Sequence, residues 1–249
     1  MTIYLDNAAT TWPKPECMIE AIARFNSHVG SNPGRSGHSM SVEAGRILFE
    51  ARDSLSRLFS IDDPMSVVFT SGMTHSLNLV IKGLLRDGGH VITTSMEHNS
   101  VMRPLRFLEE TGLELSVVQC DDSGVSDPEL IRKAVKGNTR LIIMNHGSNV
   151  SGTIAPVAET GRVAREEGVL FCVDSAQTAG CVPIDVNEMN IDLLCFSGHK
   201  GLLGPTGTGG LYIKKGLEKS LVPLMHGGTG SRSEYELQPD FMPDMFESK

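Results

Sequence analysis

Residues 195–210, with the sequence CFSGHKGLLGPTGTGG, join an apolar strand to a glycine-rich turn that carries Lys200. A second apolar segment, VLFCVD at residues 169–174, ends in Asp174. If the two strands are neighbours in one parallel sheet, their carboxyl ends meet at the same edge, and an amine and a carboxylate converge there. The sequence therefore predicts a site for a small ring compound between Lys200 and Asp174.

This pair of side chains suits one cofactor in particular. Pyridoxal 5'-phosphate (PLP) needs a lysine with which to form a Schiff base and a carboxylate that keeps its pyridine nitrogen protonated. Taken alone, a loop lysine is usually only a solvent-exposed side chain, and Asp174 could serve merely as a helix cap. The prediction therefore depends on the other residues at the same edge.

The chain has the alternation of strands and helices that such a sheet requires. Apolar and β-branched runs predict strands at 66–70, 90–94, 113–119, 140–145, 169–174, 191–197 and 209–214. Helical patterns lie at about 41–59, 73–85, 99–111, 127–136 and 156–167. Leu48, Ala51, Leu55 and Leu58 share one face of the first helix, and Ser126, Asp127 and Pro128 open the fourth. The predicted fold is α/β, with a mostly parallel seven-stranded sheet flanked by helices.

Composition narrows the possible functions. The 249 residues suffice for one large α/β domain, and a net charge of −8 without a basic cluster argues against nucleic acid as a partner. No apolar run approaches the roughly 18 residues of a membrane span, and the start, MTIYLDNAAT, lacks the pattern of a secretory signal. Five cysteines without CxxC spacing predict free thiols in a cytoplasmic protein that binds neither a metal nor a membrane.

The turn after residues 66–70 is a candidate phosphate site. Gly72, Met73 and Thr74 lead from this strand into a helix, whose free N–H groups and positive dipole end attract anions. A strand–glycine–helix turn is more often only a connection. The prediction of a phosphate site here is supported because other strand ends also carry suitable residues.

Two further strand ends carry such residues. His98 follows the strand at 90–94 and could stack on a cofactor ring, although a lone histidine is more often a surface-loop residue. Asn149 follows the strand at 140–145 and could bond a ring hydroxyl or a substrate carboxylate, although asparagine in a glycine-flanked turn is ordinarily turn chemistry.

The remaining candidates lie beside Asp174 and Lys200. Gln177 could donate to the phenolic oxygen of the cofactor, while Ser197 and His199 could contribute a hydroxyl and an imidazole to its phosphate. As ordinary loop residues, Ser197 and His199 would have no such role. Cys181 lies near the Asp174 loop, but nothing beside it argues for a depressed pKa, so we expect a buried thiol.

These residues lie in segments that resemble the class V aminotransferase family, and in particular its cysteine desulfurase-like members. The resemblance runs nearly from end to end and is specific because the segments occur together in this order. They are YLDNAATT at 4–11, FTSGMT at 69–74, EHNS at 97–100, SNVSGT at 148–153, VDSAQ at 173–177 and SGHKGLLGPTGTG at 197–209.

The resemblance implies the large domain of a PLP-dependent transferase of fold type I, extending over residues 1–249. Residues 1–20 would form an N-terminal segment and 21–249 the large domain. Lys200 would be the Schiff-base lysine and Asp174 the partner of the pyridine nitrogen, with His98 stacked on the ring as a second catalytic residue. Gln177 would lie near the ring hydroxyl, and Asn149 would face the ring hydroxyl and the substrate carboxylate. Thr74, Ser197 and His199 would lie on the phosphate.

The chain departs from the family pattern in two places. Met73 stands where family members often carry a small or hydroxyl residue, which leaves the backbone N–H donors in place. The chain ends at FESK, whereas family members continue into a small domain with a substrate-binding arginine and a loop bearing a persulfide-forming cysteine. We therefore expect a member that lacks the small C-terminal domain and is incomplete at its C-terminus.

The resemblance implies a cysteine desulfurase, which converts L-cysteine into L-alanine and enzyme-bound sulfur. Without the C-terminal domain we expect little or no turnover from this chain alone. The alternatives are another class V reaction, such as that of an aminotransferase or a selenocysteine/cysteine lyase, and a non-catalytic PLP-binding remnant. A homodimer and a sulfur-acceptor protein are the partners that the family implies.

Overall fold

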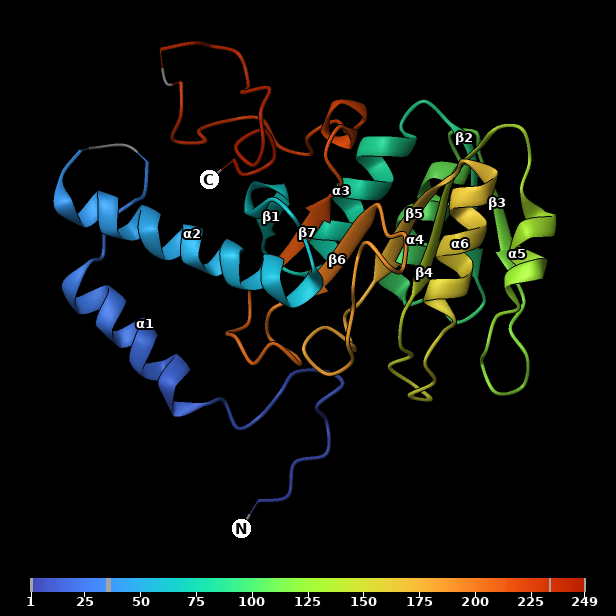
Figure 1. Ribbon diagram of the computed structural model, residues 1–249, viewed down its shortest axis with the longest axis horizontal. Coiled ribbons are helices and arrows are strands. Elements are labelled where there is room, and N and C mark those ends of the chain that lie inside the picture. The colour runs from blue at the N-terminus through green and yellow to red at the C-terminus, as the bar shows by residue number, and fades with distance from the viewer. Residues whose placement is uncertain (1, 35–36, 233, 249) are drawn as a thin grey trace.

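The computed structural model describes residues 2–34, 37–232 and 234–248. One seven-stranded sheet runs through the molecule with helices on both sides (Figure 1). The strands are β1 Val67–Thr70, β2 Gly89–Thr94, β3 Leu113–Val118, β4 Thr139–Asn145, β5 Leu170–Asp174, β6 Leu193–Ser197 and β7 Gly209–Ile213. The α-helices are α1 Glu16–His28, α2 Ser39–Phe59, α3 Met73–Leu85, α4 Asn99–Glu109, α5 Pro128–Ala134 and α6 Val157–Glu167. Short 3₁₀ helices span Pro64–Ser66 and Leu217–Ser220.

The strand order is β1-β7-β6-β5-β4-β2-β3, and the pairing is parallel except where β7 meets β1 and β6. Because β7 is antiparallel to both of its neighbours, β1 and β6 run in the same direction. The carboxyl ends of β1, β2, β4, β5 and β6 therefore lie at one edge of the sheet, and β7 begins there. A ligand in a sheet of this kind binds at that edge.

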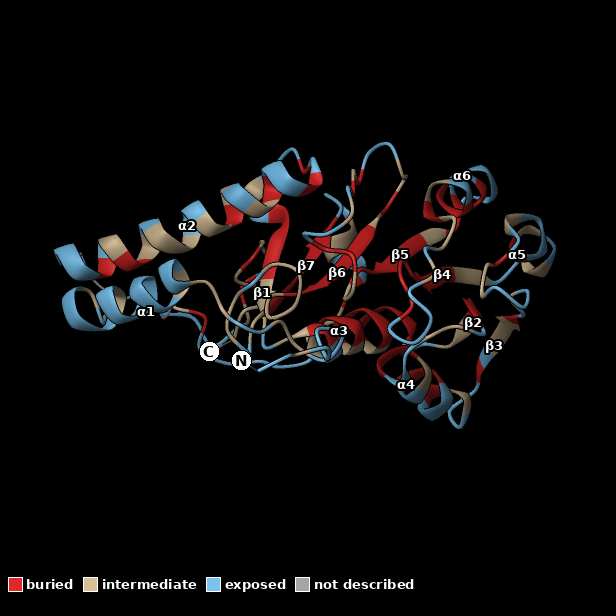
Figure 2. Cartoon of the chain, turned by 90° about the horizontal axis from the view of Figure 1, so that it is seen from below, coloured by how far each residue is buried: buried red, intermediate tan, exposed pale blue. Residues whose placement is uncertain are grey.

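Two apolar layers hold the helices on the sheet. In Figure 2, α3 and α4 lie below the buried sheet, whereas α2, α5 and α6 lie above it. Leu77 of α3 and Leu105 of α4 are fully buried in the first layer, and Phe59 of α2 and Ile131 of α5 in the second. Burying a side chain of this size contributes roughly 1.5–3 kcal/mol. The sheet and its helices thus form a rigid base for its carboxyl edge.

The predicted elements are confirmed, with small shifts at their ends. All seven predicted strands are present, and the mostly parallel arrangement is as expected. The start of α5 is capped as predicted, because the Asp127 carboxylate accepts a hydrogen bond from the N–H of Glu129 at 2.9 Å and Pro128 occupies the first turn. This helix ends at Ala134, two residues earlier than predicted.

The apolar face predicted for α2, for packing on the sheet or on a second subunit, is not the most buried face of this helix in the chain. Leu58 is 47% exposed, whereas the buried residues of this helix are Ser41, Ala44, Arg52, Ser56 and Phe59. The inner face of the helix includes a buried charged side chain, Arg52. The guanidinium of Arg52 forms an ion pair with Glu247, and its Nε donates to the carbonyl of Val67 at 3.1 Å.

This ion pair connects the last segment of the chain to β1. Glu247 Oε1 accepts a hydrogen bond from the N–H of Phe69 at 2.7 Å, and the Arg52 guanidinium lies 4.5 Å from the centre of the Phe69 ring. The segment that follows Ser220 is thereby placed against the N-terminal half of the molecule. In the described part of the chain, no helix is long and apolar enough to cross a membrane.

Candidate functional site

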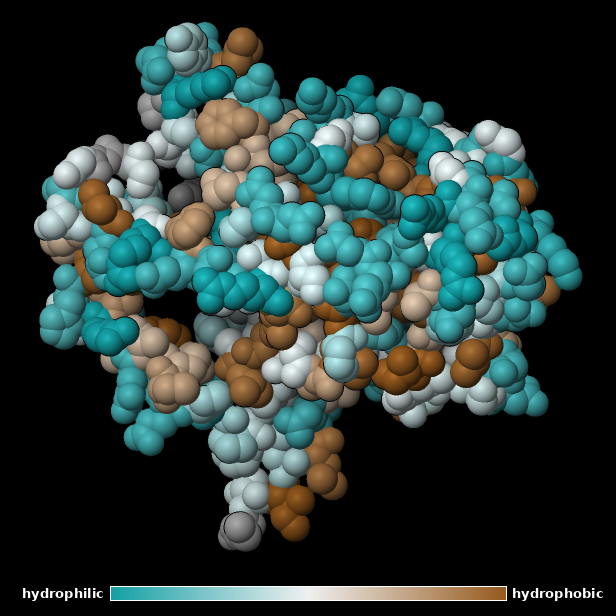
Figure 3. All heavy atoms as spheres, viewed as in Figure 1, coloured by the Kyte–Doolittle hydropathy of each residue, from teal (hydrophilic) through white to brown (hydrophobic). Residues whose placement is uncertain are grey.

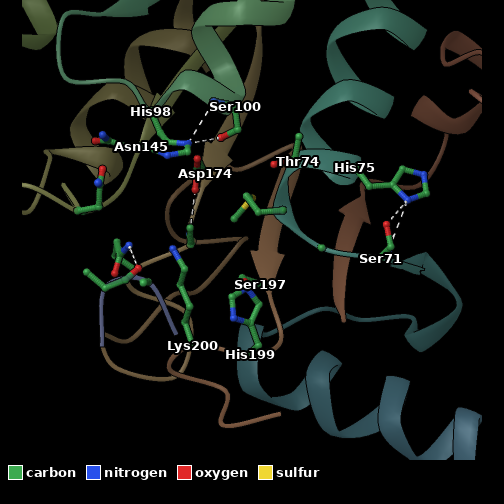
Figure 4. A pocket seen from close by; sticks show the side chains of 18 of the residues that line it. Ser71, Thr74, His75, His98, Ser100, Asn145, Asp174, Ser197, His199 and Lys200 are labelled. Carbon is green, nitrogen blue, oxygen red and sulfur yellow. Dashed lines mark hydrogen bonds between the residues drawn. The ribbon is translucent and has the colours of Figure 1, made fainter. Parts of the chain in front are cut away.

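The carboxyl edge of the sheet opens into a pocket of about 590 Å³. Figure 4 shows this pocket from close by, with Lys200 and Asp174 extending toward one another. All of the predicted site residues line it, namely Gly72, Met73, Thr74, His98, Asn149, Asp174, Gln177, Ser197, His199 and Lys200. Residues that are far apart in the sequence are therefore brought together as the strand-end argument predicted.

Asp174 and Lys200 come from neighbouring strands. Asp174 is the last residue of β5 and pairs in register with Cys195 of β6, and Lys200 follows the end of β6 by three residues. The Asp174 side chain is only 3% exposed, and its Oδ1 accepts a hydrogen bond from the N–H of Ala176 at 2.9 Å. The carboxylate therefore both caps the following turn and faces the pocket.

Burial shifts the pKa values of both groups toward the neutral forms. It raises the pKa of Asp174, against the opposing effect of His98 and Lys200, and it lowers the pKa of Lys200, against the opposing effect of Asp174. The Lys200 Nζ atom makes no hydrogen bond or ion pair with any residue in the described ranges. An amine with a lowered pKa and no partner is suited to nucleophilic attack and proton transfer.

A site for an anion lies at the start of α3. Gly72 precedes this 13-residue helix with φ of 142°, a conformation that favours glycine, and a Cβ there would meet nothing within 4 Å. The first N–H groups of an α-helix have no partner within the helix and carry the positive end of its dipole, and Met73 and Thr74 at this helix start line the pocket. The pocket also contains the buried Ser197 Oγ, which has no hydrogen-bond partner among the described residues. These features fit the phosphate group of PLP.

His98 caps the start of α4 and borders the same pocket. Its Nδ1 accepts a hydrogen bond from the N–H of Ser100 at 3.1 Å and lies 2.7 Å from the Ser100 hydroxyl. In the neutral ring the proton is therefore on Nε2. Asn149, in contrast, is exposed on the turn that follows β4 and lines the rim of the pocket.

Residues 6–14, which we call the N-terminal strap, border the pocket although no role for them was predicted from their sequence. Asp6, Ala8 and Ala9 line the pocket, and Gln177 Nε2 donates to the carbonyl of Ala8 at 3.0 Å. The strap also contacts the loop that follows β6 and carries Lys200, which we call the lysine loop. The Thr11 hydroxyl donates to the carbonyl of Lys200 at 2.8 Å. The motif YLDNAATT marks this segment in the sequence. No local sequence pattern, however, predicts that the segment contacts the lysine loop.

Glu97 is a second residue near the pocket that was not predicted from the sequence. Its Oε1 accepts hydrogen bonds from the Thr94 hydroxyl at 2.7 Å and from the N–H of Asn145 at 3.1 Å, while Oε2 is buried with no partner in the described part of the chain. Burial raises the pKa of Glu97 to about 8, and the charge of Asp174 adds to this effect. This raised pKa favours the protonated form of the Glu97 carboxyl at neutral pH, directly before His98 in the chain.

The expectation for Cys181 was wrong. Its thiol is exposed and does not line the pocket, whereas Cys172 and Cys195 are buried in the sheet. A Cβ on Gly201 would lie 2.6 Å from the Cys181 sulfur, so Cys181 packs against the neighbouring turn at the surface and not in the core. Ser71, His75, Ser100, Asn145, Gly147 and Ala176 complete the pocket lining.

Comparison with known proteins relates this chain to a protein family. The aminotransferase class-V family model matches residues 3–248. A probable cysteine desulfurase from Methanothermobacter thermautotrophicus is 39% identical over 227 residues, which cover 91% of this chain and 56% of the relative. The chain thus spans little more than half the length of this curated relative.

Solved structures give the same result. The apo cysteine desulfurase from Thermococcus onnurineus NA1 superposes with a TM-score of 0.91 at 34% identity, covering 99% of this chain and 62% of that structure. SspA in complex with cysteine superposes with a TM-score of 0.87 at 35% identity, covering 98% of this chain and 70% of that structure. PLP is the cofactor of this family. The chain therefore belongs to the class V aminotransferase family and has the fold of its cysteine desulfurases.

Proposed function

We propose that the chain binds PLP in this pocket and acts on L-cysteine as a cysteine desulfurase, giving L-alanine and passing the sulfur to a thiol as a persulfide. The observation that carries the proposal is the convergence of the Lys200 amine and the buried Asp174 carboxylate beside an anion site. The similarity to cysteine desulfurases and to a cysteine-bound structure supports the choice of L-cysteine.

The pocket residues correspond to the separate parts of the cofactor. Asp174, at the end of β5, would bond the pyridine nitrogen. Lys200 would bind the aldehyde carbon. Gln177 retains one amide N–H beyond the one that it donates to Ala8, which leaves a donor for the ring hydroxyl. The phosphate would be held by Gly72, Met73, Thr74, Ser197 and His199, with His98 against the ring and Asn149 at the rim.

The residues of the pocket are suited to moving a proton at the α-carbon. When bound, PLP withdraws electrons from the α-carbon of an amino acid and makes its proton removable. Lys200 can take that proton because burial lowers the pKa of its amine. Asp174 is stabilised as an anion once a cationic nitrogen faces it, through a charge-assisted hydrogen bond.

The proposal is tested by the products formed from L-cysteine. Purified chain is incubated with PLP, L-cysteine and dithiothreitol as the thiol acceptor, and L-alanine and sulfide are measured beside Lys200→Ala. Equal amounts of alanine and sulfide that depend on Lys200 would support a desulfurase. Because little or no turnover is predicted from this chain alone, we expect only a small amount of alanine, and steady alanine formation would contradict that prediction of impaired turnover.

The same assay separates the alternative reactions. A keto acid product from an amino-acid/keto-acid pair would indicate an aminotransferase, and selective use of L-selenocysteine a lyase for that substrate. If the protein binds PLP but no substrate changes the cofactor spectrum, the desulfurase proposal is contradicted and a cofactor-binding remnant remains.

A homodimer is part of the proposal. No residue of α1 is buried in the described chain, and Ile19 of α1 and Phe49 of α2 are 57% and 51% exposed. Figure 3 shows hydrophobic residues on the surface at the end of the molecule where these two helices lie. Apolar surface of this kind supports association with a second subunit. A sulfur-acceptor protein and a cytoplasmic location belong to the same proposal.

A further inference from the structure

The N-terminal strap meets the lysine loop at His199, where three donors lie around one carbonyl oxygen. The carbonyl of His199 accepts hydrogen bonds from Lys14 Nζ at 2.7 Å and from the N–H of Thr11 at 3.2 Å. The Thr10 hydroxyl oxygen lies 3.0 Å from the same carbonyl and also 3.0 Å from Nδ1 of the His199 ring. The single hydrogen of the Thr10 hydroxyl therefore has two possible acceptors.

The number of lone pairs decides between these acceptors. A carbonyl oxygen has two lone pairs, and Lys14 and Thr11 already occupy both of them at His199. Nδ1 of His199 has no other partner among the described residues. It is therefore the more favourable acceptor for the hydroxyl hydrogen of Thr10. The ring then accepts at Nδ1, and in its neutral form it carries its proton on Nε2.

The ring is held neutral by its surroundings. Burial lowers the pKa of His199, and the positive charges of Lys200 on the same loop and of Lys14 on the strap lower it further. No described residue is hydrogen-bonded to Nε2 of His199, and this atom is not among the buried unpartnered atoms, so it remains open to a ligand in the pocket that the ring lines. Figure 4 shows the His199 ring between Lys200 and Ser197.

We infer that Thr10 is a positioning residue, whose hydroxyl donates to Nδ1 of His199 and so holds Nε2–H ready to donate to the phosphate of the bound cofactor. The inference rests on the proposed function, because it names the cofactor phosphate as the acceptor. It gives the strap a role in cofactor binding although Thr10 itself does not line the pocket. The two lysine charges beside the ring disfavour the imidazolium, so the donor is the neutral ring.

The tautomer is measured first, on the protein without cofactor. Nitrogen chemical shifts from long-range ¹H–¹⁵N spectra of protein labelled at histidine distinguish a protonated from an unprotonated ring nitrogen, and His199→Asn assigns the His199 signals. We expect an unprotonated Nδ1 and a protonated Nε2 in the wild type and in Thr10→Ser, and a mixture of both tautomers in Thr10→Val. Thr111→Val removes a hydroxyl that donates to the carbonyl of Leu108, far from this loop, and serves as the matched control.

Cofactor affinity is measured next, with PLP and with pyridoxal, which lacks the phosphate. We expect Thr10→Val to bind PLP about tenfold more weakly, the effect of one hydrogen bond, while its affinity for pyridoxal equals that of the wild type. Thr10→Ser is expected to restore PLP affinity. A wild-type ring protonated at Nδ1, or an equal loss for PLP and pyridoxal, would overturn the inference. Absence of PLP binding by the wild type would refute the proposed function instead, while the tautomer of the ring would still be decided by its nitrogen shifts.

Discussion

Glu97 is a buried acid placed directly before the candidate catalytic His98. Its Oε1 joins the turn after β2 to β4, because it accepts from both Thr94 and the N–H of Asn145. Asn145 pairs in register with Asp174, so this carboxyl lies one strand away from the carboxylate that faces the pocket. If Glu97 is protonated, it places no second negative charge one strand away from Asp174.

Replacing Glu97 by glutamine should alter the pH dependence of stability. The pKa of Glu97 in the folded chain is about 8, above its value of 4.5 in an unfolded chain, so the folded state binds an extra proton between these values. The wild type should lose stability relative to Glu97→Gln as the pH rises from 5 to 8, by roughly 1 kcal/mol per pH unit. Urea unfolding of cofactor-free protein at several pH values measures this. A stability difference that stays constant with pH would show that Glu97 is ionised throughout.

The sequence predicted the pocket residues that lie at or just after strand ends. It did not predict the residues that act through another side chain. Lys200, Asp174 and Ser197 were found because the ends of parallel strands share an edge. Glu97 and Thr10 were missed because their importance comes from desolvation and from a contact across 189 residues of chain. Neither effect leaves a local sequence pattern.

The element that shapes the anion site is the turn between β1 and α3, and β7 packs against it. A Cβ added to Gly209, the first residue of β7, would lie 2.6 Å from the Cα of Gly72. Gly209→Ala should therefore destabilise the fold by about 1–3 kcal/mol, the cost of overpacking, and should weaken PLP binding. Gly45→Ala in α2 meets nothing within 4 Å and is the matched control, expected to be neutral or slightly stabilising. Urea unfolding that gives both variants the same stability would contradict this role.

The ion pair between Arg52 and Glu247 joins α2 to the last segment of the chain. Their side chains are only 7% and 9% exposed, so removing one charge leaves the other buried and unpaired. Glu247→Gln should lower the free energy of unfolding by about 3 kcal/mol and expose residues 221–248 to limited proteolysis. Glu43→Gln breaks an exposed pair with Arg46 and should change little. Resistance of Glu247→Gln to proteolysis at the wild-type level would argue against this link.

Periodicity predicted the elements where burial follows the sequence pattern. The elements α3, β4 and β6 were predicted closely because their buried residues are mostly apolar. Two features were not predicted. The helix α1 buries none of its residues in the described chain, and α2 turns Arg52 rather than Leu58 toward the core. A buried ion pair is formed with a partner far along the chain, and a helix pattern cannot reveal it.

The whole molecule presents apolar surface on its two N-terminal helices. If this surface is a subunit interface, the 26.9 kDa chain should behave as a dimer in light scattering after size-exclusion chromatography. Ile19→Glu together with Phe49→Glu should shift it toward the monomer, because a charge buried at an interface is costly. Leu130→Glu, at an exposed position of α5, is the control. A wild type that stays monomeric at high concentration would contradict the dimer.

The central claim is that one pocket binds PLP through Lys200 and Asp174. The most direct measurement is the visible absorption spectrum of the chain with PLP, recorded beside Lys200→Ala and Asp174→Ala, followed by borohydride reduction and mass spectrometry of the peptides. We predict an absorption band that requires Lys200, a pyridoxyl group fixed on Lys200, and much weaker binding in Asp174→Ala. A folded wild type that shows no such band, or a label on another lysine, would contradict the account.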